Sequence, residues 1–183
     1  MTSDKQRDYP AHLIEDFMLP DGTPVRIRPI RAEDLAVHAR FVGGLSYETS
    51  FARLLSPRKP QPDELRRWTD IDYDTELALV ATIVQEGMEQ EIGVARFVKS
   101  ETSDAEAGSA EFAIVIADAW QRRGLAQKLL KSLIAAATAA GVRVLSDITL
   151  YDNRAMLGLA RKLGFRLRRD PGNPNLTRVT LRL

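Results

Sequence analysis

Residues 121–126 form a short segment that combines two cations with small residues and could bind an anion. The segment reads Gln121-Arg122-Arg123-Gly124-Leu125-Ala126 and stands directly before a strongly helical stretch. The first turn of a helix leaves backbone N–H groups without partners and directs the positive end of the helix dipole outward. The pattern therefore predicts a diphosphate cradle made mainly of backbone, with the arginines adding charge. The alternative is an ordinary strand-to-helix turn in which Gly124 supplies the flexibility.

Composition excludes several kinds of chemistry for the other side chains. The 183 residues include no cysteine and only two histidines, His12 and His38, so we expect no disulfide, no thiol nucleophile and no metal site. With 26 Lys or Arg against 25 Asp or Glu, the formal net charge of +1 argues against binding nucleic acid through bulk charge. We find no targeting or membrane segment and expect a cytoplasmic protein that does not bind membranes.

The elements around this segment can be read from hydrophobic periodicity. Residues 124–140 give the clearest helix, because leucines recur at helical spacing and Gly141 ends it. The other predicted helices span residues 31–42, 46–55, 63–69 and 153–163. The predicted strands span residues 23–28, 76–84, 91–98, 110–116, 142–150, 165–169 and 177–183.

This order predicts an α/β (α+β) fold in which helices flank a mixed central sheet. The late alternation of strands and helices favours parallel pairing in the middle of the sheet. We expect residues 1–8 to be a disordered tail and residues 9–183 to form a single domain. Residues 9–20 could add a strand or form an interface arm, and the sequence does not distinguish the two.

Two motifs together resemble the signatures of the GNAT acetyltransferase superfamily. Residues 121–126 are similar to its Q/R-x-x-G-x-G/A motif, which holds the pyrophosphate of acetyl-CoA. Downstream, Asn153-Arg154-Ala155 and Lys162-Leu163-Gly164-Phe165 resemble its second signature, N-x-x-A…K-x-G-F. The resemblance runs from residue 24 to the C-terminus. It implies the GNAT fold and transfer of an acetyl group from acetyl-CoA to an amine.

A closer resemblance is to the catalytic domain of Pat-type protein lysine acetyltransferases. Tyr9-Pro10, Asp21-Gly22, Arg28-Pro29-Ile30-Arg31 and Glu33-Asp34 occur in the order found there. This resemblance implies a protein lysine as acceptor, and a small-molecule amine is the alternative acceptor. The oligomeric state stays open, with a homodimer among the options.

Glu111 is the candidate catalytic residue, because a glutamate at this place acts as general base in the family. An amine is almost wholly protonated at pH 7 and must lose a proton before it attacks a thioester. A carboxylate partly buried in an apolar strand would have a raised pKa and could take that proton. The alternative for Glu111 is a residue at the edge of the sheet that pairs with an arginine or faces solvent.

The resemblance also implies which residues contact the cofactor. Backbone groups of the strand would pair with the pantetheine arm, and an N–H near Ile114 or Val115 could stabilise an oxyanion. Asn153 occupies the place of a cofactor-binding asparagine, although its local role could be to cap a helix. The predicted cofactor-binding residues are Ile114, Val115, Ile116, Gln121, Arg122, Arg123, Gly124, Leu125, Ala126, Gln127 and Asn153.

One position departs from the family pattern. Many GNAT enzymes carry a tyrosine seven residues after the asparagine, as general acid for the departing thiolate, and here that position is Ala160. The departure does not exclude catalysis, because a thiol is acidic enough to leave as thiolate. It is also the main support for an alternative interpretation, a non-catalytic acyl-CoA-binding module.

Overall fold

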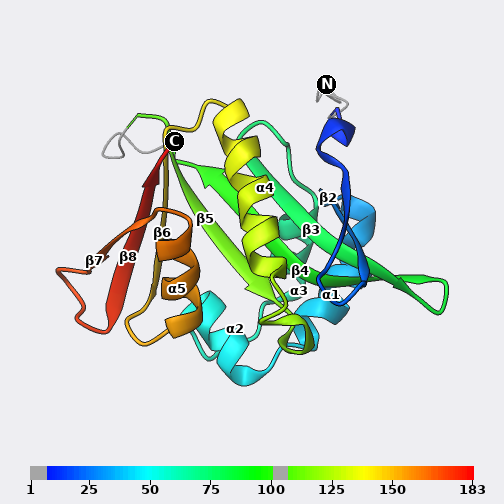
Figure 1. Ribbon diagram of the computed structural model, residues 1–183, viewed down its shortest axis with the longest axis horizontal. Coiled ribbons are helices and arrows are strands. Elements are labelled where there is room, and N and C mark those ends of the chain that lie inside the picture. The colour runs from blue at the N-terminus through cyan, green and yellow to red at the C-terminus, as the bar shows by residue number, and fades with distance from the viewer. Residues whose placement is uncertain (1–7, 101–106) are drawn as a thin grey trace.

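The computed structural model describes residues 8–100 and 107–183, which are built around one eight-stranded sheet (Figure 1). The strand order is β1-β2-β3-β4-β5-β6-β8-β7, and β5 and β6 are the parallel pair between otherwise antiparallel neighbours. The strands are β1 (Glu15–Met18), β2 (Pro24–Pro29), β3 (Glu76–Gln85), β4 (Met88–Lys99), β5 (Ser109–Ile116), β6 (Val144–Leu150), β7 (Arg166–Arg169) and β8 (Leu176–Arg182). The predicted mixed sheet with parallel pairing at its middle is confirmed.

The N-terminal segment adds a strand to this sheet. After a 3₁₀ turn at Ala11–Leu13, β1 pairs antiparallel with β2, and Glu15 lies opposite Ile27. The strand alternative for residues 9–20 is therefore the correct one. The predicted tail, residues 1–8, falls outside the described residues except for Asp8.

Helices cover both faces of the sheet (Figure 1). On one face lie α4 (Leu125–Ala139) and α5 (Arg154–Lys162), and on the other lie α1 (Leu35–Gly43), α2 (Tyr47–Leu54) and α3 (Pro62–Thr69). Leu129 and Leu133 of α4 are fully buried in the larger apolar cluster, while Phe41 of α1 packs with Val80 and Val94 in a separate one. Among the described helices, none combines the length and apolar character needed to cross a membrane.

One predicted boundary is wrong, and the start of one predicted helix has a different geometry. The hairpin turn between β3 and β4 consists of Glu86 and Gly87 alone, both with positive φ, instead of the six residues predicted. Two such residues match the twist of the strands, so β3 and β4 run further than their hydrophobic pattern indicates. The first helix begins as a 3₁₀ turn, Ala32–Asp34, in which the Asp34 carboxylate accepts from the Arg31 amide and pairs with Arg28.

Candidate active site

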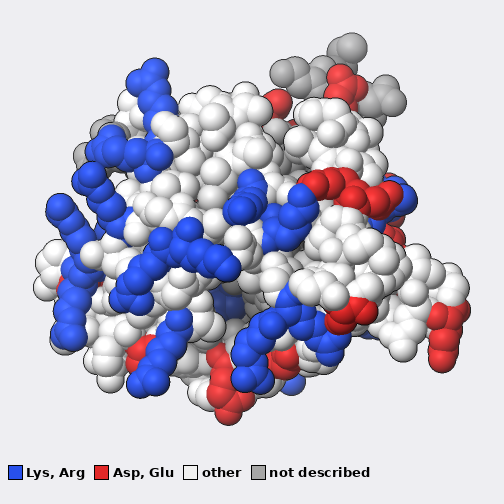
Figure 2. Space-filling view, in the orientation of Figure 1, with Lys and Arg blue, Asp and Glu red and all other residues white. Residues whose placement is uncertain are grey.

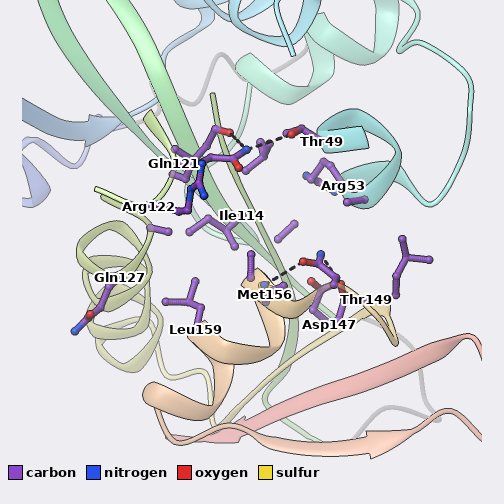
Figure 3. A pocket seen from close by; sticks show the side chains of 18 of the residues that line it. Thr49, Arg53, Ile114, Gln121, Arg122, Gln127, Asp147, Thr149, Met156 and Leu159 are labelled. Atoms are coloured by element: carbon purple, nitrogen blue, oxygen red, sulfur yellow. Dashed lines mark hydrogen bonds between the residues drawn. The ribbon is translucent and has the colours of Figure 1, made fainter. Parts of the chain in front are cut away.

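The candidate site lies where β5 and β6 separate. These strands pair only at Ser109–Val144, Ala110–Leu145 and Glu111–Ser146 and then diverge, and we call this point the fork. Beyond it a cleft of about 590 Å³ opens between the strands, with α2 on one side and α5 on the other (Figure 3). Along the cleft, β5 contributes four consecutive residues, Ala113 to Ile116, and has no strand partner on this side among the described residues.

The predicted diphosphate cradle closes one end of this cleft. Arg122 and Gly124 both have left-handed backbone, with φ of 61° and 85°, which turns neighbouring amides toward one side. Among the described residues, none accepts a hydrogen bond from the amides of residues 122–127, because α4 begins at Leu125 and the first backbone bond of this region is donated by Lys128 to Gly124. The segment therefore presents free N–H groups at a helix N-terminus, as an anion site requires.

A hydrogen-bonded cluster fixes the loop that carries this cradle. The Asp118 carboxylate accepts from the Ser46 amide and hydroxyl and from the Thr49 hydroxyl, all at 2.6–2.9 Å. The Gln121 amide donates to Thr49 Oγ1 and to the Ile116 carbonyl, each at 3.1 Å. Gln121 lines the cleft, but its side chain binds the protein, so it holds the loop against α2 and the end of β5.

The predicted cofactor-binding residues divide into two groups. Nine of them line the cleft: Ile114, Val115, Ile116, Gln121, Arg122, Gly124, Ala126, Gln127 and Asn153. Leu125 and Arg123 do not. The Leu125 side chain is 1 % exposed in the core, and Arg123 bonds Asp21 at 3.2 Å and lies over the Trp120 ring at 4.8 Å. Any contact of these two with a ligand in the cleft must therefore come from their backbone amides.

Basic side chains surround the cleft from outside. Figure 2 shows Lys and Arg gathered on the face formed by α4, α5 and the last strands, around a hollow, while Asp and Glu lie toward β1, at the β3–β4 hairpin and below the hollow over α2. The last 43 residues contribute nine Arg or Lys and three Asp to this asymmetry. A ligand with several phosphates would meet a favourable field there.

Asn153 has the capping role that the sequence left open. Its Oδ1 accepts from the Met156 amide at 3.1 Å at the start of α5, and its Nδ2 donates to Thr149 Oγ1 at 3.1 Å. The side chain also lines the cleft. The helix cap is confirmed, and the contact to a cofactor stays a prediction.

Glu111 lies on the opposite side of the fork from the cradle. Its side chain is exposed and lines a second cavity of about 230 Å³, which we call the side pocket, together with Trp68, Arg67 and Arg96. The expectation that an apolar strand partly buries this carboxylate is wrong. Alternation along β5 turns Phe112 into the core and directs Glu111 to the opposite, open face.

The sequence analysis missed two charged residues at the fork. Asp147, the first residue of β6 beyond the paired segment, lines both the cleft and the side pocket, and so does Arg53 of α2 (Figure 3). Burial raises the pKa of Asp147 to about 7, with the Ile148 amide and Arg53 opposing the shift and Glu111 adding to it. The sequence feature that could have indicated Asp147 is that it is a single aspartate in an otherwise uncharged strand.

Neither tyrosine position offers an acid for a leaving thiolate. Ala160 is a fully buried residue of α5, and Tyr151 is half exposed in the turn after β6 and does not line the cleft. Proton donors in this part of the cleft would have to come from solvent or from other side chains.

The comparison with known families identifies this architecture. Residues 25–166 match the family model of the acetyltransferase (GNAT) domain. The chain belongs to this family. The resemblance found in the two sequence motifs is thereby confirmed, and the chain is a GNAT acetyltransferase.

Individual relatives support the same assignment. Acetyltransferase PA5475 of Pseudomonas aeruginosa is 36 % identical over 161 residues, covering 87 % of this chain and 83 % of that protein. The GNAT domain of S. lividans PAT superposes with a TM-score of 0.85 at 28 % identity, over 96 % of this chain and 100 % of that one. The fold also matches yncA of Salmonella typhimurium, solved with its cofactor acetyl-CoA, with a TM-score of 0.67 at 22 % identity over 87 % of this chain and 94 % of that one.

Proposed function

We propose that this GNAT acetyltransferase uses acetyl-CoA and transfers the acetyl group directly to the ε-amine of a protein lysine. The observation that carries the proposal is the cleft itself. It joins free backbone amides at one end, an unpaired strand edge in its middle, and a pocket with carboxylates at the fork. This order matches the order of chemical groups in acetyl-CoA and its acceptor: diphosphate, pantetheine amides, thioester, amine.

Each part of the cleft would have a distinct task. The amides of residues 122–127 hold the diphosphate, and the free edge of β5 pairs with the amides of the pantetheine arm. A β5 amide near Ile114 or Val115 donates to the carbonyl oxygen as negative charge develops. A carboxylate at the fork accepts the proton of the acceptor ammonium, and the sequence-based assignment of that base is Glu111.

The direct route follows from the residues present. The chain has no cysteine, and none of the described residues that line the cleft is a serine. The acetyl group would therefore pass from thioester to amine while both substrates are bound. A protein lysine is favoured as acceptor by the resemblance to Pat-type domains and by the structural match to the GNAT domain of S. lividans PAT.

The first test is a thermal-shift titration with acetyl-CoA, with CoA and ATP as comparisons. Saturation at about 100 times the dissociation constant adds roughly 2.7 kcal/mol of stability, which for this size of domain is on the order of 5–10 °C. We expect shifts with acetyl-CoA and CoA and a smaller one with ATP. No shift at millimolar acetyl-CoA would contradict the cradle.

The second test concerns the acceptor. Release of CoA thiol is followed with lysine-containing peptides, with the same peptides acetylated at the ε-amine, and with a panel of polyamines, amino acids and aminoglycosides. Turnover of unmodified peptides supports the lysine assignment. Turnover confined to one class of small amine would replace it with the alternative acceptor.

A further inference from the structure

Among the described residues, Asp147 is the one carboxylate that lines both cavities at the fork. The cleft reaches it from the thioester end, and the side pocket reaches it from the face covered by α1–α3. Its position on β6 explains this placement. Ser146 is the last residue of β6 that pairs with β5. Asp147 is therefore the first β6 residue that has no β5 residue beside it. On the other side it lies opposite the uncharged Val179 of β8.

The Asp147 carboxylate is only partly engaged with the protein. Its Oδ1 accepts from the Ile148 amide at 2.8 Å, and among the described residues Oδ2 has no hydrogen-bond partner. The described part of the chain contains no fully enclosed side-chain oxygen without a partner, so Oδ2 has open space beside it. A carboxylate oxygen that is free and faces a cavity can receive a hydrogen bond from a ligand.

Several charged groups face Asp147 from the surrounding elements. Arg53 approaches from α2 and Glu111 from β5, and among the described residues these two shift the pKa of Asp147 through their charge. Farther along the side pocket stand Arg67 of α3 and the ion pair between Arg96 of β4 and Glu76 of β3, at 2.8 Å. Glu48 of α2 and Lys162 of α5 stand at the cleft.

We propose that Asp147 is the general base that takes the proton of the acceptor ammonium, while Glu111 binds that ammonium from the outer side of the same pocket. This inference rests on the proposed function, because it concerns the same transfer. The geometry favours this division, since Asp147 adjoins the cleft where the thioester would lie and Glu111 lines only the side pocket.

The protonation behaviour of Asp147 fits this role. Burial raises its pKa to about 7, whereas a base with an ordinary aspartate pKa would be too weak to accept a proton from an ammonium at neutral pH. Below pH 7 the group is protonated and inactive as a base. Above pH 7 it carries the charge that the reaction needs.

The transfer can be written with all atoms in balance. The Asp147 carboxylate takes one proton from R–NH₃⁺, giving the carboxylic acid and R–NH₂. The amine nitrogen forms a bond to the carbonyl carbon, the C–S bond breaks, and its electron pair leaves with sulfur. A second nitrogen proton passes to water, and the Asp147 proton passes to the thiolate. The products are the amide, CoA thiol and one released proton.

The decisive experiment compares two kinds of acceptor in Asp147→Asn. A lysine peptide is protonated at neutral pH and needs the base, whereas methoxyamine is already neutral and does not. We expect Asp147→Asn to lower kcat with the peptide by about 100-fold or more. The same variant should retain near wild-type turnover of methoxyamine. Equal losses with both acceptors would overturn the proposal, because they would indicate a structural role.

Two further variants separate the roles at the fork. Glu111→Gln should raise KM for the peptide and keep the rise of kcat/KM with pH through about 7, while Asp147→Asn should abolish that rise. Asp152→Asn makes the same substitution at an exposed turn position outside both cavities and should behave as wild type. Loss of the pH dependence in Glu111→Gln instead of Asp147→Asn would assign the base to Glu111.

A measurement that needs no acceptor keeps this inference distinct from the proposed function. In protein labelled with ¹³C at aspartate carboxyls, one resonance should titrate near pH 7, be missing from Asp147→Asn, and move when acetyl-CoA is added. Titration near pH 4, or no response to acetyl-CoA, would overturn the role of Asp147. Failure of every amine to be acetylated while this resonance behaves as expected would count against the acceptor assignment alone.

Discussion

The two faces of the sheet are stabilised by different kinds of contact. Under α4 and α5 the core is apolar and continuous, with Leu129, Leu133 and Ala160 fully buried. Under α1–α3 the apolar cluster is smaller and is accompanied by buried ionic groups. There Arg28 binds Asp34 and Glu89, His38 contacts Glu91, and Arg96 binds Glu76.

This difference separates stability from chemistry. Apolar packing contributes in proportion to the area buried and has little directional preference. Contacts between charged side chains depend on position, because a buried charge is tolerated only when its partner lies within reach. A buried charge without a partner lowers the stability of the fold. We interpret the ionic face as the part that fixes how α1–α3 lie on the sheet. The side pocket and Asp147 lie on this face.

The largest effect should come from breaking the most buried contact between two titratable side chains. His38 Nδ1 lies 3.0 Å from both Glu91 carboxylate oxygens, and both side chains are almost fully enclosed. Glu91→Ala leaves the imidazole without its partner, so we expect a loss of about 3–5 kcal/mol in unfolding free energy. Urea denaturation at neutral pH measures this loss.

Two further variants test whether the stability lost in Glu91→Ala comes from the interaction between Glu91 and His38. Leu129→Ala on the apolar face should cost about 2–5 kcal/mol through a cavity and show no dependence on salt or pH. Replacing both partners, His38→Leu with Glu91→Leu, should cost less than Glu91→Ala alone. A double variant that is less stable than the single one would contradict the ionic interpretation.

The next effect concerns the pH dependence of stability on the ionic face. The folded-state pKa of Asp147 is raised from 3.8 to about 7, so the folded protein binds this proton more tightly than the unfolded chain. Its contribution is therefore present at low pH and is lost as the pH rises through 7. Between pH 5 and 8 we expect the wild type to lose ~2–3 kcal/mol relative to Asp147→Asn. If the free energy of unfolding depended on pH in the same way for the two proteins, the raised pKa would be contradicted.

The smallest effect belongs to the cradle. Gly124 has φ of 85° and open space where a Cβ would stand, so Gly124→Ala adds backbone strain of about 1–2 kcal/mol and no clash. Because the strain acts on the amides that face the cleft, the variant should also reduce the thermal shift with acetyl-CoA. Gly87→Ala in the β3–β4 turn is the matched control, with φ of 76° and equally open space. Gly87→Ala should cost similar stability and leave the thermal shift with acetyl-CoA unchanged. An equal thermal shift in the two variants would indicate that the cradle does not take part in acetyl-CoA binding.

Elements with strong local patterns could be predicted from the sequence. The leucines of α4 and the position of its N-terminus follow from helical spacing and from Gly124, and nine of the eleven predicted cofactor residues line the cleft. The parallel pair β5–β6 followed from the order of elements. The helix depends on neighbours in the sequence, which explains why its spacing reveals it. The cofactor-binding residues on β5 and Asn153 were instead predicted from the resemblance to the GNAT family.

The parts that failed depend on contacts between distant residues. The exposure of Glu111 depends on which face of β5 the early helices leave open. The position of Asp147 between the cleft and the side pocket depends on where β5 and β6 stop pairing. Asp118 and Ser46 are 72 residues apart, and nothing in either local pattern indicates that they bind. Such contacts arise only once the chain has folded.

The short pairing of β5 with β6 has a mechanical consequence. Five strands on one side and three on the other are joined across the fork by three residue pairs, whereas β3 and β4 are paired over almost their whole length. Opening of a sheet requires the least free energy where the fewest hydrogen bonds and contacts must break. We therefore expect the two parts of the sheet to separate most easily at the fork. Backbone amides at the fork should lose their protection from hydrogen exchange before the other sheet amides do. A ligand that spans the cleft would contact both parts of the sheet and so restrict their separation.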